Sequence, residues 1–214
     1  VQGFDQPMHV AGIAFGSASP LQWSTKEQVA DFFDVKADVE ALLAPAVPQF
    51  EPAEHPAMHP GRCAKVLVNG QAVGHVGELH PRWRQGWDLT QAPVMFELSL
   101  DAVLHRAVPK STGVAKFPNV ERDIAVIVKD SVTHAQLMAA VNAAKTQGLL
   151  RQTVLFDVYR PKAESASMAM DEKSLAVRLT LNSDEATLNE AQIDGVVQAV
   201  VAELTAQVAA RLRA

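Results

Sequence analysis

The sequence has 214 residues, of which 48% are hydrophobic and 20% are charged, and its formal net charge is −5 at pH 7. This length allows one large domain or two small ones with real cores, so a disordered chain is excluded as the default. Its apolar stretches fall far short of the roughly 20 residues of a membrane helix, and no signal-like segment opens the chain. The single cysteine, Cys63, cannot form an internal disulfide, which fits a reducing cytoplasm.

Positive charge is concentrated in one part of the chain. Residues 1–108 contain 7 Lys or Arg and 12 Asp or Glu, whereas residues 110–162 contain 8 and 4. The overall charge disfavours a nucleic-acid binder, because phosphate contacts need Lys and Arg. The distribution still leaves a locally basic face in the second half, which could meet an RNA backbone.

The first half has the pattern of a mixed sheet-and-helix domain. Apolar residues recur at helical spacing from Lys26 to Leu43, and the prolines at 45 and 48 stop this predicted helix. Two apolar runs, 64–68 and 72–78, flank Asn69-Gly70, a pair that favours a two-residue hairpin turn. The other predicted elements are a buried strand over His9–Phe15, a short helix over Pro81–Trp87 and a strand over Val94–Leu100.

The second half predicts a ferredoxin-like domain. A segment rich in proline, serine and glycine at 106–120 marks a linker, so we divide the chain into residues 1–107, a linker at 108–117 and residues 118–214. The pattern beyond it is βαββαβ, which forms an antiparallel sheet with helices on one face and the other face free. The predicted elements are strand 123–128, helix 133–144, strand 149–158, strand 174–181, helix 188–207 and strand 208–212. The fold class is therefore α+β.

The motifs of self-contained enzymes are absent from the sequence. It has no glycine-rich phosphate loop, no paired CxxC, no His-Glu-x-x-His and no Gly-x-Ser-x-Gly, so we expect no catalytic residue in this chain. His55 and His59 have the spacing of helical metal ligands, but prolines follow both and disfavour that helix. We therefore expect no metal site, and we interpret Cys63 as a packing residue.

Trp83, Arg84 and Trp87 allow two interpretations. They could form a platform on which nucleic-acid bases stack, because aromatic rings and guanidinium groups both stack on bases. They could instead close the core of the first domain, and we favour this interpretation because tryptophan is usually buried.

One polar cluster in the second half carries chemistry suited to a nucleotide. It lies at the end of the strand 149–158, where alternation places Asp157 and Tyr159 on one face and Phe156, Val158 and Arg160 on the other. An aromatic ring can stack on a base, and a carboxylate can accept hydrogen bonds from guanine. By itself the cluster is also typical of a solvated strand end.

Several collinear motifs resemble a known family. Their order and spacing are similar to those of phenylalanyl-tRNA synthetase beta subunits of the bacterial type. The motifs of the second half, in the ferredoxin-fold anticodon-binding domain, are Phe117-Pro118-x-x-x-Arg122-Asp123-Ile124-Ala125, Leu155-Phe156-Asp157-Val158-Tyr159-Arg160 and Lys173-Ser174-Leu175-Ala176. Those of the first half, at the end of a noncatalytic class II synthetase-like module, are Asp31-Phe32-Phe33-Asp34-Val35, Glu54-His55-Pro56 and Gly77-Glu78-Leu79-His80-Pro81. Because the chain opens with Val, we expect a C-terminal fragment of such a subunit.

The resemblance implies a role in tRNA recognition without chemistry in this chain. It implies a heterotetramer of two alpha and two beta subunits, in which the alpha subunit uses ATP and Mg²⁺ to charge the tRNA for phenylalanine in the cytoplasm. No cofactor is implied for the chain itself. By motif, the anticodon contact maps onto Ala125, Asp157, Tyr159 and Ser174, with Arg122, Arg160, Lys173 and Arg178 as supporting cations.

Two other functions remain open at this stage. The sheet could pack on a partner subunit, which would make the chain a protein-interaction scaffold. Ferredoxin-like sheets also occur in small-molecule sensors, so a regulatory domain is the third alternative.

Overall fold

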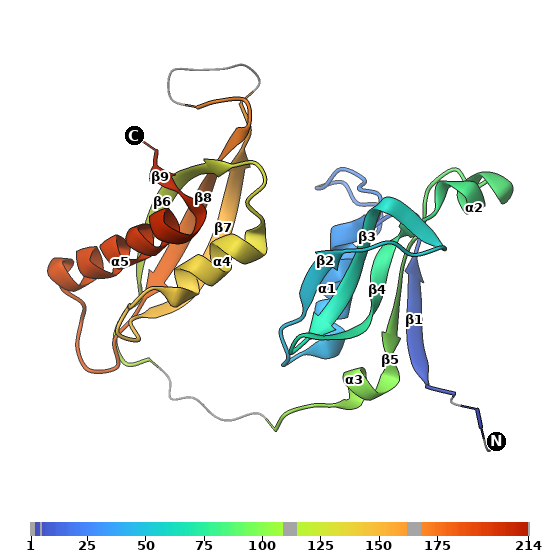
Figure 1. The fold of residues 1–214 in the computed structure, drawn as a ribbon, viewed down its shortest axis with the longest axis horizontal. Helices are drawn as coiled ribbons and strands as arrows, with labels where there is room; N and C mark the ends of the chain where they lie inside the picture. Colours follow the sequence, from blue (N-terminus) through green and yellow to red (C-terminus); the bar gives the residue numbers. More distant parts are fainter. Residues whose placement is uncertain (1–2, 5, 109–114, 162–167, 214) are drawn as a thin grey trace. The chain divides into compact units, whose positions relative to one another are not determined.

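The chain forms two compact units in a computed structural model that describes residues 3–4, 6–108, 115–161 and 168–213. Unit 1 is Val1–Ser111 and unit 2 is Thr112–Ala214, and each has its own antiparallel sheet and hydrophobic core (Figure 1). The predicted α+β class is confirmed. The division falls within the predicted linker 108–117, of which residues 109–114 lie outside the described residues.

Unit 1 is a five-stranded sheet with one long helix on one face. Apolar side chains of α1 (Phe32–Leu43), among them Val35, Val39 and Leu43, pack on those of the sheet, which include Val66, Val76 and Leu98. The strand order is β1-β5-β4-β3-β2. The strands are β1 (His9–Ala14), β2 (Gln49–Pro52), β3 (Met58–Val68), β4 (Gln71–Leu79) and β5 (Val94–Ser99), and the short helices are α2 (Pro81–Gly86) and α3 (Leu100–Leu104). Of these, β2 and α3 were not predicted.

The predicted hairpin at Asn69-Gly70 is confirmed. The two residues join β3 to β4 with φ angles of 51° and 78°, in the left-handed region that a two-residue turn requires. Asparagine and glycine tolerate this region better than other residues, which explains why the pair marks the turn.

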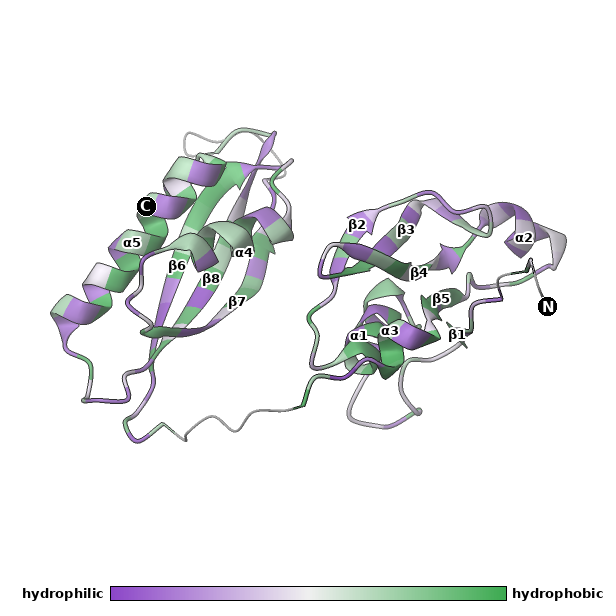
Figure 2. Ribbon diagram, turned by 60° about the horizontal axis from the view of Figure 1, so that its bottom comes forward, coloured by the Kyte–Doolittle hydropathy of each residue, from purple (hydrophilic) through white to green (hydrophobic). Residues whose placement is uncertain are grey.

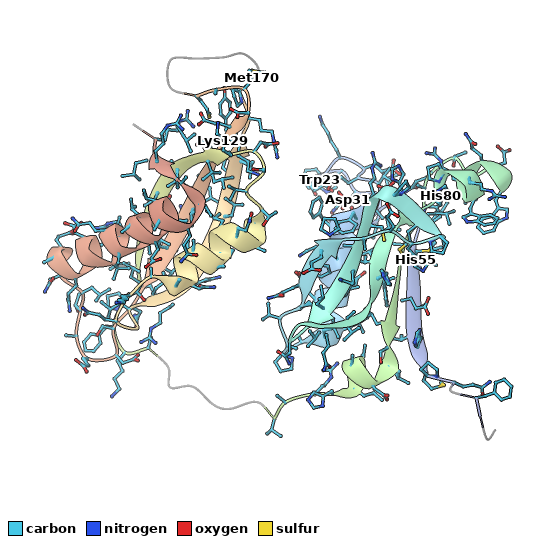
Figure 3. The ribbon with its side chains drawn as sticks, viewed as in Figure 1. Trp23, Asp31, His55, His80, Lys129 and Met170 are labelled. Atoms are coloured by element: carbon cyan, nitrogen blue, oxygen red, sulfur yellow. The ribbon has the colours of Figure 1, made fainter. Side chains whose placement is uncertain are left out.

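The prediction that a helix begins at Lys26 was wrong, because α1 begins at Phe32. The carboxylate of Asp31 accepts hydrogen bonds from the backbone N–H groups of Phe33 and Asp34, at 2.7 and 3.2 Å. The carboxylate of Asp34 in turn accepts from the N–H of Asp31, the residue labelled in Figure 3, which completes a capping box. The cap starts the helix inside the periodic segment, and Val29 before it is 57% exposed.

The prediction that Trp83 and Trp87 close the core of the first domain was also wrong. None of the residues of α2 is buried, and the two indoles are 38% and 61% exposed. Their rings stack on each other with centroids 5.8 Å apart. The guanidinium of Arg82 lies 5.3 Å from the Trp83 ring centroid, while Arg84 donates to the carbonyls of Leu89 and Thr90.

Unit 2 has the predicted βαββαβ order. Its sheet order β7-β8-β6-β9 places the first and third strands side by side, as in a ferredoxin-like fold, and every pairing is antiparallel. The elements are β6 (Val120–Lys129), α4 (His134–Ala143), β7 (Leu150–Tyr159), β8 (Glu172–Leu181), α5 (Glu190–Val208) and β9 (Arg211–Leu212). Capping boxes at Thr133 and Asn189 set the starts of the two helices. None of the described helices is long and apolar enough to cross a membrane.

Both helices of unit 2 cover the same face of its sheet (Figure 1). Leu137 of α4 and Val200 of α5 are fully buried in one core with Val126 of β6 and Leu179 of β8. Apolar and polar residues alternate along the strands, as the colours of Figure 2 show, because successive side chains point to opposite faces. The second face carries the polar residues and no helix, and we call it the open face.

We predict that Leu179→Ala strongly destabilises unit 2. Leu179 is fully buried against the helices, and truncating such a leucine costs about 2–5 kcal/mol because a cavity remains. Urea unfolding followed by circular dichroism measures the change. The matched control is Val154→Ala, on the open face and 41% exposed, which should change stability by less than about 1 kcal/mol. Equal losses for both variants would contradict the assignment of faces.

Candidate functional site

The candidate site is the middle of the open face of unit 2. Strand pairing aligns Asp157 of β7 with Ala176 of β8, and Ala176 with Ala125 of β6. The neighbouring row aligns Tyr159 with Ser174. Paired residues in an antiparallel sheet point to the same face, so the four residues that the family motifs single out, Ala125, Asp157, Tyr159 and Ser174, lie together.

These residues offer an aromatic ring and an unpaired carboxylate next to two small side chains, Ala125 and Ala176, which we call the alanine floor. Tyr159 is 46% exposed, and Asp157 is exposed as well. The carboxylate of Asp157 makes no hydrogen bond or ion pair with any residue that the structure describes. Ala125 and Ala176 each contribute only a methyl group, so the space between the ring and the carboxylate is open to a flat ligand.

Arg213 is a site residue that the sequence analysis missed. Its guanidinium lies 5.4 Å from the ring centroid of Tyr159, and Nη1 lies 3.5 Å from the hydroxyl of Ser174. The backbone N–H of Arg213 donates to the carbonyl of Ala125 at 2.9 Å, which fixes this end of the chain to β6. In the described part of the chain no carboxylate pairs with Arg213, so its charge is available to an anion. The signal in the sequence was the alternation of Arg211, Leu212 and Arg213 at the end of the predicted strand 208–212.

A β-bulge corrects the predicted face of Phe156. The register of β7 against β8 shifts between Leu155, which pairs with Val177, and Asp157, which pairs with Ala176. The extra residue, Phe156, does not follow the alternation, and its ring has the guanidinium of Arg178 at 5.3 Å. Phe156 therefore shares the open face with Asp157, although the sequence pattern placed it on the opposite face. Val158 pairs with Leu175 on the helix-covered face, as predicted.

Of the four predicted supporting cations, Arg178 alone lies on the open face, and its charge is already neutralised. Its Nε and Nη2 donate to the two carboxylate oxygens of Asp123 at 2.8 Å, and Glu121 lies 3.3 Å away. The hydrogen bonds from Arg178 hold the pKa of Asp123 below its ordinary value. Because the Arg178 guanidinium is already paired with two carboxylates, a phosphate would gain little from its charge.

The other three predicted cations lie away from the four central residues. Arg122 pairs with Glu190 of α5 at 3.2 Å. Arg160 donates to the carboxylate of Asp130 at 2.8 Å, and buried Lys173 donates to the carbonyl of the same residue at 2.7 Å. These interactions connect the ends of neighbouring strands at Asp130 and connect β6 to α5.

Ion pairs also border the open face near the start of β8. Glu172 accepts two hydrogen bonds from Arg211 of β9, at 2.6 and 2.8 Å, and one from the N–H of Ala169. Lys129 pairs with Asp171 at 2.8 Å, at the same end of the sheet as Met170 (Figure 3). The hydrogen bonds from Arg211, followed by that from Ala169, lower the pKa of Glu172 to about 2.

The histidines and the cysteine of unit 1 have structural partners. Nδ1 of His55 accepts from the N–H of Ala57, and Nδ1 of His59 accepts from the N–H of Gly61. Burial raises the pKa of the Cys63 thiol, whose sulfur lies 3.5 Å from that of Met58, so the thiolate is disfavoured. No group of three or more His, Cys, Asp or Glu suited to a metal occurs among the described residues.

Comparison with known proteins identifies the family of both units. Residues 1–100 match the family model of the phenylalanyl tRNA synthetase beta chain CLM domain, and residues 115–213 match that of the ferredoxin-fold anticodon binding domain. The chain belongs to the phenylalanyl-tRNA synthetase beta chain family. The resemblance seen in the sequence motifs is thereby confirmed.

Curated relatives agree over the whole chain. It is 49% identical to a phenylalanine–tRNA ligase beta subunit of Cupriavidus pinatubonensis and 47% identical to one of Burkholderia lata, each over 100% of this chain. A third, from Chromobacterium violaceum, is 46% identical over 99% of this chain. The chain spans 26–27% of the length of these relatives, about a quarter.

We predict that Glu172→Gln lowers stability at neutral pH but not at low pH. The folded-state pKa of about 2 lies below the ordinary value of 4.5, so the ionised carboxylate stabilises the fold above pH 4.5. This contribution is lost as the pH falls through about 2. Urea midpoints measured at pH 7, 4 and 2 should therefore converge for the two proteins. A difference that stays constant across this range would contradict the linkage.

Proposed function

We propose that unit 2 holds the anticodon of the phenylalanine tRNA on its open face, within a phenylalanine–tRNA ligase whose chemistry lies in another subunit. The observation that carries this proposal is the exposed pair of Tyr159 and Asp157 beside the alanine floor. A single-stranded base can stack on the tyrosine ring, and the carboxylate can accept hydrogen bonds from the Watson–Crick donors of guanine. The match of residues 115–213 to an anticodon-binding model supports it.

Unit 1 is proposed to be a scaffold that contacts the rest of the ligase. In this proposal ATP and Mg²⁺ act in the alpha subunit of an assembly of two alpha and two beta subunits. The exposed, stacked pair of Trp83 and Trp87 suits a protein contact, because tryptophan and arginine are enriched at interface hot spots. Such an enzyme acts in the cytoplasm.

A protein partner on the open face of unit 2 is the competing proposal. It would have to bury the carboxylate of Asp157, which has no partner among the described residues, and an unpaired buried charge is costly. A sensor of free phenylalanine is the third alternative, and it is tested by measuring the stability of the chain with phenylalanine and with tRNA. Stabilisation of the chain by phenylalanine, without any effect of tRNA, would replace the RNA proposal.

The proposal predicts that Tyr159→Ala weakens tRNA binding by the assembled ligase by about 1–3 kcal/mol, because one stacked base is lost. Filter binding is measured with the phenylalanine tRNA and with a tRNA whose anticodon bases are exchanged, each at two salt concentrations. The wild-type ligase should prefer the cognate anticodon, and the variant should lose much of this preference. Equal binding of both tRNAs by the wild-type ligase would remove the proposed function.

Arg213→Gln should weaken tRNA binding in a way that depends on salt. Arg213 lies beside the proposed nucleotide site and has no carboxylate partner among the described residues, so we expect it to contact a phosphate. Loss of one phosphate contact reduces the slope of log K against log salt by about 1 and affects cognate and exchanged anticodons equally. The matched control is Arg122→Gln, since Arg122 pairs with Glu190 on α5. An unchanged slope in Arg213→Gln would contradict the phosphate contact.

A further inference from the structure

The open face of unit 2 carries a second exposed aromatic ring, Phe156, that the proposed anticodon contact does not use. The ring is 51% exposed, although phenylalanine is usually buried and the core of unit 2 lies on the other side of the same sheet. The bulge between Leu155 and Asp157 is what turns it outward. Bulges often re-aim a side chain near a functional site, so the exposure of Phe156 calls for a function.

Arg178 gives the Phe156 ring a fixed support. The guanidinium lies 5.3 Å from the ring centroid, within the range of a cation–π contact. Its position is fixed by two hydrogen bonds of 2.8 Å to Asp123 and by an ion pair with Glu121 at 3.3 Å. The guanidinium thus holds the ring in place, and we call the pair the Phe156 platform.

The Phe156 platform lies at a useful distance from Tyr159. Tyr159 pairs with Ser174, and Phe156 is the extra residue of the bulge opposite Ala176, two residues further along β8. Two residues of a strand span about 7 Å. This separation is about twice the 3.4 Å rise of a stacked strand, so two neighbouring bases of an extended chain can each meet one ring. Asp157 lies between Phe156 and Tyr159 on the same strand, so its carboxylate and both rings face one short stretch of RNA.

The charge pattern favours a base over a phosphate on the platform. Arg178 already shares its charge with two carboxylates, so an added phosphate would meet Asp123 and Glu121 as well. A neutral, flat base meets no such repulsion and gains stacking on the exposed ring. Continuity with the alanine floor also favours the same RNA over a separate ligand.

We propose that the Phe156 platform is a second nucleotide-stacking site, which binds an unpaired base next to the base on Tyr159. This inference rests on the proposed function. Stacking on an aromatic ring is tolerant of sequence, so the platform accepts any base, whereas Asp157 discriminates. One base of the anticodon is thus held for its identity and its neighbour for its stacking alone.

The test compares Phe156→Leu with Phe156→Tyr in the assembled ligase. The first variant keeps an apolar side chain but removes the aromatic face, so binding of the phenylalanine tRNA should weaken about fivefold or more. The second keeps the face and should bind as the wild type does. Because stacking is tolerant of sequence, Phe156→Leu should preserve the preference for the cognate anticodon, and Asp157→Asn should reduce it.

A fluorescent base supplies a readout that does not depend on affinity. A tRNA carrying 2-aminopurine at each anticodon position in turn should show, at one position only, a fluorescence change on binding that Phe156→Leu abolishes. Val158→Thr is the matched control, because Val158 is on the same strand and 42% exposed but lies on the helix-covered side. Its tRNA binding and fluorescence should equal those of the wild type.

The outcomes separate this inference from the proposed function. Wild-type binding by Phe156→Leu, with weakened binding by Tyr159→Ala, would overturn the platform and leave the anticodon contact in place. A defect of Phe156→Leu in the assembly of the subunits, with unchanged tRNA binding, would assign the ring to a protein contact and also overturn it. Wild-type ligase that ignores an exchanged anticodon would overturn both.

Discussion

The one-sided burial of the unit 2 sheet is the constraint on which the candidate site depends. Helices α4 and α5 pack on one face, so every second residue of β6 and β8 is committed to the core. The residues between them are released from packing and can carry polar groups. Because the strand register is fixed by the core, the positions of Asp157 and Tyr159 on the open face are fixed as well. The core therefore positions the site without containing any of it.

Electrostatics explains how an acidic chain could include the proposed RNA contact. Most cations of unit 2 that looked available in the sequence are paired with carboxylates, and they join strand ends, β9 or a helix to the sheet. Such exposed pairs contribute little stability individually, but they define the edges of the open face. The charge left for a ligand is small, and Arg213 supplies part of it. A contact of this kind selects a nucleotide more than it attracts a polyanion.

Much of the fold could be predicted because local rules agreed with the tertiary structure. Asn69-Gly70 satisfies the backbone of its turn, and the strand and helix order of unit 2 follows from periodicity. The start of α1 was missed because helical periodicity continues upstream of Asp31, whereas the capping box at Asp31 sets the first residue of the helix. The exposure of α2 was missed because tryptophan is buried in most proteins, and composition cannot show that a short helix lacks a partner.

The site was predictable in part for the same reason. Asp157 and Tyr159 follow simple alternation from the pairing of β7, so the pattern was enough to place them on one face. Phe156 was misplaced because a bulge adds one residue to a strand without any marker in the sequence, such as glycine. Arg213 was missed because it lies one residue beyond the predicted strand 208–212, and the tertiary pairing of β9 with β6 decides its place.

The two methyl groups of Ala125 and Ala176 have an evolutionary consequence. They occupy the lowest part of the open face, and their side chains take no part in the core. A replacement by serine or threonine would raise the floor and add a hydroxyl without disturbing the packing beneath the helices. Residues for recognition and residues for folding thus alternate along the same strand, so selection can change the first set while the second is conserved.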